Sequence, residues 1–127
     1  SYGMKHIYRK SSLDKMYALL KENNMLILAS DQDAKKRGVF VNFFDQPSST
    51  PKGSAIFHMQ SGAPMVFSVA HKEKDGTVVI SFSKIELNGN ASIETITQTY
   101  TTMLEKKVRE YPDHYFWFHR KWKTRTE

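Results

Sequence analysis

A continuous apolar run at residues 25–29 (Met-Leu-Ile-Leu-Ala) places the strongest constraint on the fold of this chain. Its hydrophobic residues are consecutive rather than alternating, which is typical of a strand buried on both faces, as in the centre of an α/β sheet. Residues 30–33 (Ser-Asp-Gln-Asp) follow the run, so they would lie at the carboxyl end of that strand. Ligands and catalytic groups usually lie at that edge of open α/β sheets.

Helix and strand signals alternate along the rest of the chain. Hydrophobic spacing and β-prone runs predict helices at residues 12–23, 51–61 and 92–111, and strands at residues 39–44, 64–70 and 77–82. Ser11 and Ser12 precede the first helix, and Ser92 is the expected N-cap of the last. Thr50 and the two serines before it are expected to start the middle helix. An Asp-Gly pair at residues 75–76 predicts a hairpin turn. We therefore expect an α/β fold in which a mixed sheet packs with helices.

Composition limits the classes to which the chain can belong. Its 127 residues, 39% hydrophobic and 25% charged, fit a single domain over residues 1–127. Cysteine is absent, which excludes disulfides and Cys-based zinc sites. No apolar run approaches the ~20 residues that span a bilayer, and no signal peptide is predicted, so we expect this chain itself to be soluble. The net charge of +6 favours an anionic partner.

The stretch at residues 115–125 (YFWFHRKWKTR) joins an aromatic cluster to a cationic one. Its rings belong to Tyr115, Phe116, Trp117, Phe118 and Trp122, and its donors to His119, Arg120, Lys121, Lys123 and Arg125. We expect Trp117, Phe118 or their neighbours to cover the long helix while the basic residues project. Two ligand classes suit such a surface: nucleic acid, with bases on the rings and phosphates on the cations, or an anionic lipid at a membrane interface.

A second basic cluster is formed by Lys35, Lys36 and Arg37, which follow the residue 30–33 segment after a single alanine. These cations either bind an anion or form an ordinary solvated loop. Thr50, with the amides of the helix that follows it, could also hold an anion, although a simple helix cap explains the same residues. The sequence leaves both alternatives open.

Asp31 and Asp33 are the best candidates for chemistry, because a carboxylate at a strand end can orient a histidine during general-base catalysis. An Asx turn or a helix cap is the alternative. The five histidines lack matching partners: His71 with Asp75 reads as a surface arrangement, and His58 as a half-buried, hydrogen-bonded residue. No His cluster of metal-binding type is present, so neither a metal nor another cofactor is expected.

Five sequence blocks taken in order resemble the carboxyl-terminal portion of the late lipid A biosynthesis acyltransferases, the family of lauroyl and myristoyl transferases. The blocks are DQD at 31–33, GVFVNFF at 38–44, TPKG at 50–53, SGAP at 61–64 and YPDHYFWFHRKWKTR at 111–125. The last block is the most specific, and the resemblance covers nearly the whole chain. Departures from the family pattern occur at Asp45, at residues 57–58, at Lys121 and at Thr126.

The resemblance implies a partial acyltransferase-type α/β domain from an enzyme of lipopolysaccharide biosynthesis. Such an enzyme moves a fatty acyl chain from an acyl carrier protein thioester to a phosphorylated glucosamine lipid, at the cytoplasmic face of the bacterial inner membrane. The family base is a histidine followed after four residues by an acid, and no histidine here meets that pattern. We therefore expect a fragment that is inactive alone, that pairs with a missing amino-terminal half, and that can self-associate.

The resemblance also suggests roles for individual residues. Asp31, with Asp33 as second choice, would support the missing histidine. The residues expected to bind the acceptor phosphates or an anionic membrane surface are Lys35, Lys36, Arg37, Thr50, His119, Arg120, Lys121, Lys123 and Arg125. One alternative is a non-enzymatic basic module that binds nucleic acid or an anionic lipid, and another is a scaffold derived from an acyltransferase. Nucleic acid is the less favoured ligand, because no glycine-aromatic RNA-binding motif is present.

Overall fold

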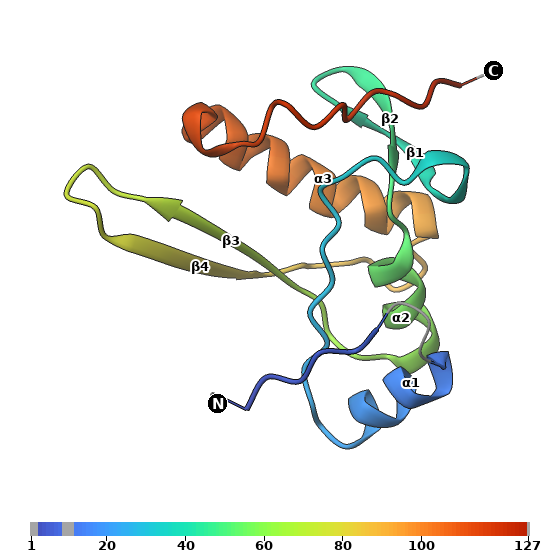
Figure 1. Ribbon diagram of the computed structural model, residues 1–127. Helices are drawn as coiled ribbons and strands as arrows, with labels where there is room; N and C mark the ends of the chain where they lie inside the picture. Colours follow the sequence, from blue (N-terminus) through green and yellow to red (C-terminus); the bar gives the residue numbers. More distant parts are fainter. Residues whose placement is uncertain (1–2, 9–11, 127) are drawn as a thin grey trace.

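The computed structural model describes residues 3–8 and 12–126 and shows a mixed α/β arrangement (Figure 1). The helices are α1 (Leu13–Lys21), α2 (Gly53–Ser61) and α3 (Ile93–Glu110), with short 3-10 turns η1 (Lys35–Arg37) and η2 (Pro112–His114). The strands are β1 (Val39–Phe43), β2 (Gln46–Thr50), β3 (Val66–Lys72) and β4 (Val78–Lys84). The predicted fold class is confirmed. Ser11 lies outside the described residues, whereas the Ser12 side chain caps α1 by accepting a hydrogen bond from the Asp14 amide.

The first hairpin pairs β1 with β2 in antiparallel register, with Phe43 opposite Gln46. Its turn residues Phe44 and Asp45 both have positive φ angles, of 53° and 58°, which suits a two-residue turn that matches the strand twist. Helix α3 packs against β1 (Figure 1), and the Gln98 side chain both accepts from the Asn42 amide and donates to the Asn42 carbonyl. The edge of β1 therefore finds its hydrogen-bond partners on α3.

The second hairpin pairs β3 with β4 and extends away from the rest of the fold (Figure 1). Gly76 at its tip has a φ angle of 92°, and the Asp75 carboxylate accepts from the Thr77 amide, as expected for an Asp-Gly turn. At its base, Ile85 joins a buried cluster with Ala55, Ile96 and Tyr100. This cluster attaches α2 and the hairpin base to α3.

The predicted strand at residues 25–29 is wrong. The segment forms no strand, and Met25, Ile27 and Leu28 are exposed. A buried strand needs hydrogen-bonding neighbours on its flanks, and each of the four described strands pairs only within its own hairpin. The apolar run has the composition of a buried strand, but within the described residues no strand lies beside it to form the hydrogen-bonded ladder.

The predicted cap for the middle helix is also wrong. Ser48, Ser49 and Thr50 are buried in β2, and the N-cap of α2 is Lys52, whose side chain makes no capping hydrogen bond. Pairing with β1 overrides the local preference of hydroxyl residues for a helix start, because the ladder satisfies their backbone groups. Across the described part of the chain, no helix has the length and apolarity needed to cross a bilayer.

Candidate functional site

Asp33 joins two parts of the chain that are far apart in sequence. Its carboxylate accepts hydrogen bonds from the Thr124 amide and the Thr124 hydroxyl, both at 2.9 Å, and from the Lys35 amide at 2.6 Å. Its own amide donates to His119 Nε2 at 2.9 Å. The Asp33 loop and the terminal basic segment are therefore held side by side.

The environment of Asp33 keeps its carboxyl group ionised. Partial burial alone would raise the pKa of Asp33, but the hydrogen bonds from Thr124 and Lys35 outweigh it and lower the pKa below its ordinary value. Both carboxylate oxygens already accept hydrogen bonds from the chain itself. This geometry suits a structural role for Asp33 and leaves Asp31 as the more accessible carboxylate of the pair.

Asp31 is exposed, and its backbone carbonyl accepts a hydrogen bond from the Tyr115 hydroxyl at 3.5 Å. Burial, and next the negative charge of Asp31, raise the pKa of Tyr115 to about 12, so this hydroxyl stays protonated as a donor. In the described parts of the chain, the Asp31 carboxylate forms neither a salt bridge nor a hydrogen bond. Asp31 is thus positioned by its backbone while its carboxylate faces solvent.

Lys121 does not project from the surface as predicted. Only 1% of the residue is exposed, its Nζ lies 3.4 Å from the Thr50 hydroxyl, and it lies 5.8 Å from the centre of the Phe43 ring. Burial lowers the pKa of Lys121 to about 8, against the opposing charges of Asp31 and Asp33. No local pattern distinguishes this lysine from its exposed neighbours. Its burial follows from the contact of the terminal segment with β2.

A hollow of about 360 Å³ lies between the Asp33 loop and the terminal segment, and we call it the basic hollow. Its lining residues are Asp33, Lys35, Phe116, Phe118, His119, Arg120 and Lys123. It therefore brings one cation of the first basic cluster together with two cations of the terminal cluster. Lys36, Arg37 and Arg125 are exposed outside its lining, whereas Thr50, like Lys121, is buried.

Tyr115 and Trp122, rather than Trp117 and Phe118, anchor the terminal segment to β1. The rings of Tyr115 and Trp122 lie 5.8 Å and 5.6 Å from the buried ring of Phe43, and Trp122 Nε1 donates to the Phe43 carbonyl at 3.2 Å. Trp117 and Phe118 are exposed. The buried face of β1 thus sets the path of the terminal segment past the basic hollow.

Comparison with known proteins identifies the family of this chain. The family of bacterial lipid A biosynthesis acyltransferases matches residues 1–124. The chain belongs to this family. It is 28% identical over 119 residues to a lipid A biosynthesis palmitoleoyltransferase of Escherichia coli (strain K12), which covers 91% of this chain and 39% of that protein.

Two further relatives give the same result. A lipid A biosynthesis acyltransferase of Shigella flexneri is 28% identical over 119 residues, covering 91% of this chain and 39% of that protein. A lipid A biosynthesis lauroyltransferase of Escherichia coli (strain K12) is 31% identical over 130 residues, covering 93% and 42%. The resemblance inferred from the five sequence blocks is confirmed, and the chain spans about two fifths of the length of these relatives.

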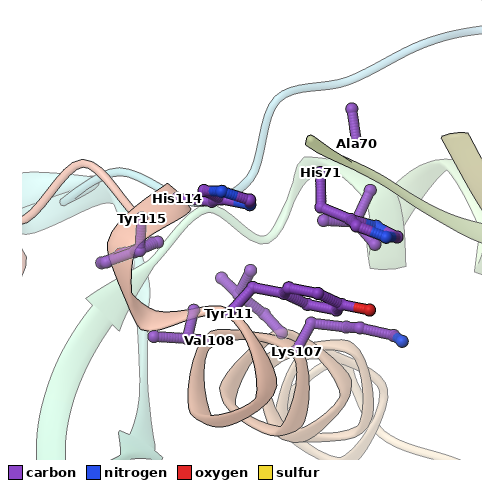
Figure 2. A pocket seen from close by; sticks show the side chains of 9 residues that line it. Ala70, His71, Lys107, Val108, Tyr111, His114 and Tyr115 are labelled. Atoms are coloured by element: carbon purple, nitrogen blue, oxygen red, sulfur yellow. The ribbon is translucent and has the colours of Figure 1, made fainter. Parts of the chain in front are cut away.

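This acyltransferase family member also has a smaller cavity, of about 50 Å³, between β3 and the end of α3 (Figure 2). The ring of His71 stacks on Tyr111 at 4.1 Å, and Tyr111 stacks on His114 at 5.8 Å. His71 is buried, and its Nε2 lies 2.9 Å from Glu73 Oε1, so its predicted surface arrangement with Asp75 is wrong. The alternation of strand β3 turns His71 toward α3, a signal already present in the sequence.

Two other histidines of this acyltransferase family member also have hydrogen-bond partners. His58 is partly buried and its Nδ1 lies 2.7 Å from the Ala63 carbonyl, as predicted. His114 Nδ1 accepts from the Lys72 amide at 3.4 Å. Over residues 3–8 and 12–126, no group of three metal-ligating side chains is brought together.

Proposed function

We propose that this chain is the acceptor-binding portion of an enzyme that transfers a fatty acyl chain from an acyl carrier protein thioester to a phosphorylated glucosamine lipid in lipopolysaccharide biosynthesis. The family match supports the reaction class. The observation that supports the acceptor is the basic hollow, in which Lys35, Arg120 and Lys123 lie beside exposed phenylalanine rings. Such a surface suits a ligand with phosphates on one side and acyl chains on the other.

In this proposal, Asp31 and Asp33 have separate roles. Asp33 builds the site, since its hydrogen bonds to Thr124 and Lys35 hold the two basic segments together. Asp31 supports a general-base histidine contributed by the missing amino-terminal half, by orienting its ring and balancing its charge as it deprotonates the acceptor hydroxyl.

The cations divide into those that line the basic hollow and those that lie outside it. Lys35, Arg120 and Lys123, with His119, would contact the acceptor phosphates, while the exposed Lys36, Arg37 and Arg125 would contact the surrounding anionic headgroups. Lys121 and Thr50 contact each other in the interior, so they would act by holding the terminal segment against β2. Because the proposed acceptor is a lipid, we also propose a membrane-surface location, at the cytoplasmic face of the bacterial inner membrane.

None of the five histidines in this chain carries the His-x4-acid pattern, so we propose that the chain is inactive without the amino-terminal half of the enzyme. A nucleic-acid-binding module is not favoured, because the family match and the order of the sequence blocks both indicate lipid chemistry.

The test is acyl transfer from acyl carrier protein to a phosphorylated glucosamine lipid by the complete gene product that contains this chain. We expect Asp31→Asn to lower kcat by at least about a hundredfold. We expect Arg120→Gln to raise KM for the phosphorylated acceptor more than for its dephosphorylated analogue. Asp113→Asn, a change at an exposed acid in η2, is the matched control and should leave both constants unchanged.

The same assay tests the fragment proposal. The isolated chain should show no turnover, and robust turnover would refute the requirement for an amino-terminal half. Full activity of the Asp31→Asn enzyme would refute the role assigned to that carboxylate.

A further inference from the structure

The most exposed large apolar side chains of the terminal segment lie together on one turn, residues 116–118, which we call the terminal knuckle. Phe116 is 64% exposed, Trp117 48% and Phe118 90%. The turn is closed by hydrogen bonds from the Trp117 amide to the Tyr115 carbonyl at 2.9 Å and from the His119 amide to the Phe116 carbonyl at 3.1 Å. The knuckle is therefore an ordered projection.

Both flanks of the terminal knuckle are held against the fold. On one side the Tyr115 ring packs on Phe43, and on the other the Trp122 ring stacks on the same phenylalanine. The Trp117 indole Nε1 donates to the Pro112 carbonyl at 2.8 Å, which directs its polar edge inward. Two phenylalanine rings, with centres 6.0 Å apart, form the outermost part. Leaving such rings in water is unfavourable, so this patch suits contact with an apolar phase, and the charges beside it distinguish it from the exposed apolar side chains of β4.

The charge around the terminal knuckle indicates which apolar phase this is. Phe116 and Phe118 line the same hollow as Lys35, Arg120 and Lys123. The acid of that hollow, Asp33, already accepts hydrogen bonds from Thr124 and the Lys35 amide. Apolar rings beside a group of cations are the arrangement by which proteins bind the interface of an anionic bilayer, with rings among the acyl chains and cations at the phosphates.

We propose that the terminal knuckle inserts into the headgroup-acyl boundary of an anionic membrane, which holds Lys35, Arg120 and Lys123 at the level of the lipid phosphates, where they also meet the phosphates of the acceptor. The inference deepens the proposed function, since it identifies the part of the site through which a lipid acceptor is reached in its bilayer. It does not require catalysis, so it is tested on this chain by binding alone.

The experiment measures co-sedimentation of the chain with vesicles of phosphatidylglycerol and phosphatidylcholine. Binding should be lost on vesicles of phosphatidylcholine alone and weakened by added salt. The double variant Phe116→Ser/Phe118→Ser should bind the anionic vesicles at least about tenfold more weakly. The matched control is Ile80→Ser/Phe82→Ser, which removes exposed apolar side chains from β4 and should bind as the unchanged chain does.

Depth of insertion provides a second measurement. Lipids brominated in their acyl chains should quench the tryptophan fluorescence of the bound chain, and Trp117→Phe should abolish the quenching, because the other tryptophan, Trp122, packs against Phe43. Circular dichroism of each variant checks that the fold is retained.

Three results would overturn the inference. The Phe116→Ser/Phe118→Ser variant could bind as tightly as the unchanged chain, the β4 variant could be the one that loses binding, or the unchanged chain could bind a single-stranded oligonucleotide and not the anionic vesicles. Failure of the proposed acyl transfer with retained knuckle-dependent vesicle binding would refute the proposed function alone, so the two proposals fail separately.

Discussion

Replacing Lys121 by methionine tests how the interior of this domain accommodates a buried charge. Methionine keeps a long unbranched side chain but removes the ammonium that lies 3.4 Å from the Thr50 hydroxyl and 5.8 Å from the centre of the Phe43 ring. The residue is 1% exposed, so solvent screens its charge poorly. Comparing this variant with the unchanged chain therefore measures how the buried, protonated side chain of Lys121 changes the free energy of unfolding.

The magnitude follows from the pKa of Lys121, which burial lowers from 10.5 to about 8 in the folded chain. In the unfolded chain the lysine keeps its ordinary pKa. Between pH 8 and pH 10.5 the unfolded state therefore binds a proton that the folded state has released, and the free energy of unfolding rises with pH. The full displacement corresponds to about 3 kcal/mol. Below pH 8 both states hold the proton, and the whole cost of burying the charge is present.

The assay is urea unfolding followed by tryptophan fluorescence at a series of pH values from 7 to 10.5. Relative to the Lys121→Met variant, the unchanged chain should gain about 3 kcal/mol of stability across that range. Tyr100 and Tyr115, whose pKa values are raised chiefly by burial, titrate in both proteins, so their contributions cancel in the difference. Lys123→Met, at an exposed neighbour, is the control and should show no such trend. A difference between Lys121→Met and the unchanged chain that stays constant with pH would refute the reasoning.

Three further predictions concern stability and can be measured by urea or thermal unfolding. Gly38→Ala should destabilise the fold by about 1–3 kcal/mol, because the added Cβ would overlap Ser49 Oγ and lie 2.8 Å from the Ala34 Cβ. Gly53→Ala is the control, since open space surrounds that position, and it should be neutral or stabilising; equal effects of the two changes would contradict the steric argument. Ser92→Ala should cost about 1 kcal/mol, since the Ser92 side chain accepts from the Thr95 amide at the start of α3, and an unchanged midpoint would exclude that cap. Asp33→Asn should cost about 2 kcal/mol at neutral pH. Because hydrogen bonds lower the pKa of Asp33 in the folded state, its contribution is complete above pH 3.8 and is lost as pH falls through the folded pKa, so the variant should show weaker acid sensitivity; identical acid profiles would contradict this.

Local sequence signals predicted the elements that depend on neighbouring residues. Helix α3 starts at the Ser92 cap and ends before Pro112, as its apolar spacing and the missing proline amide require. The second hairpin turns at Gly76, because an Asp-Gly pair tolerates the positive φ angle. Helix α1 likewise begins after Ser12. In each case the deciding interactions join residues close together in the chain.

The site was predicted only in part, because its deciding interactions join residues that are far apart in the chain. Asp31 and Asp33 are both aspartates and lie two residues apart. The Asp33 carboxylate accepts a hydrogen bond from Thr124, which is 91 residues away in sequence, whereas the Asp31 carboxylate faces solvent. Lys121 has the same charge as Lys123, yet it is buried against Thr50. No pattern within a short window distinguishes the members of either pair.

By itself, then, the sequence determined the family, the α/β class and the cationic and aromatic character of the terminal segment. The tertiary structure decided which of those residues face solvent, because burial and hydrogen bonding depend on what another part of the chain places beside them. Residues 25–29 illustrate the same limit, since an apolar run can specify that a strand would be stable in an interior but cannot supply the neighbouring strands that make one.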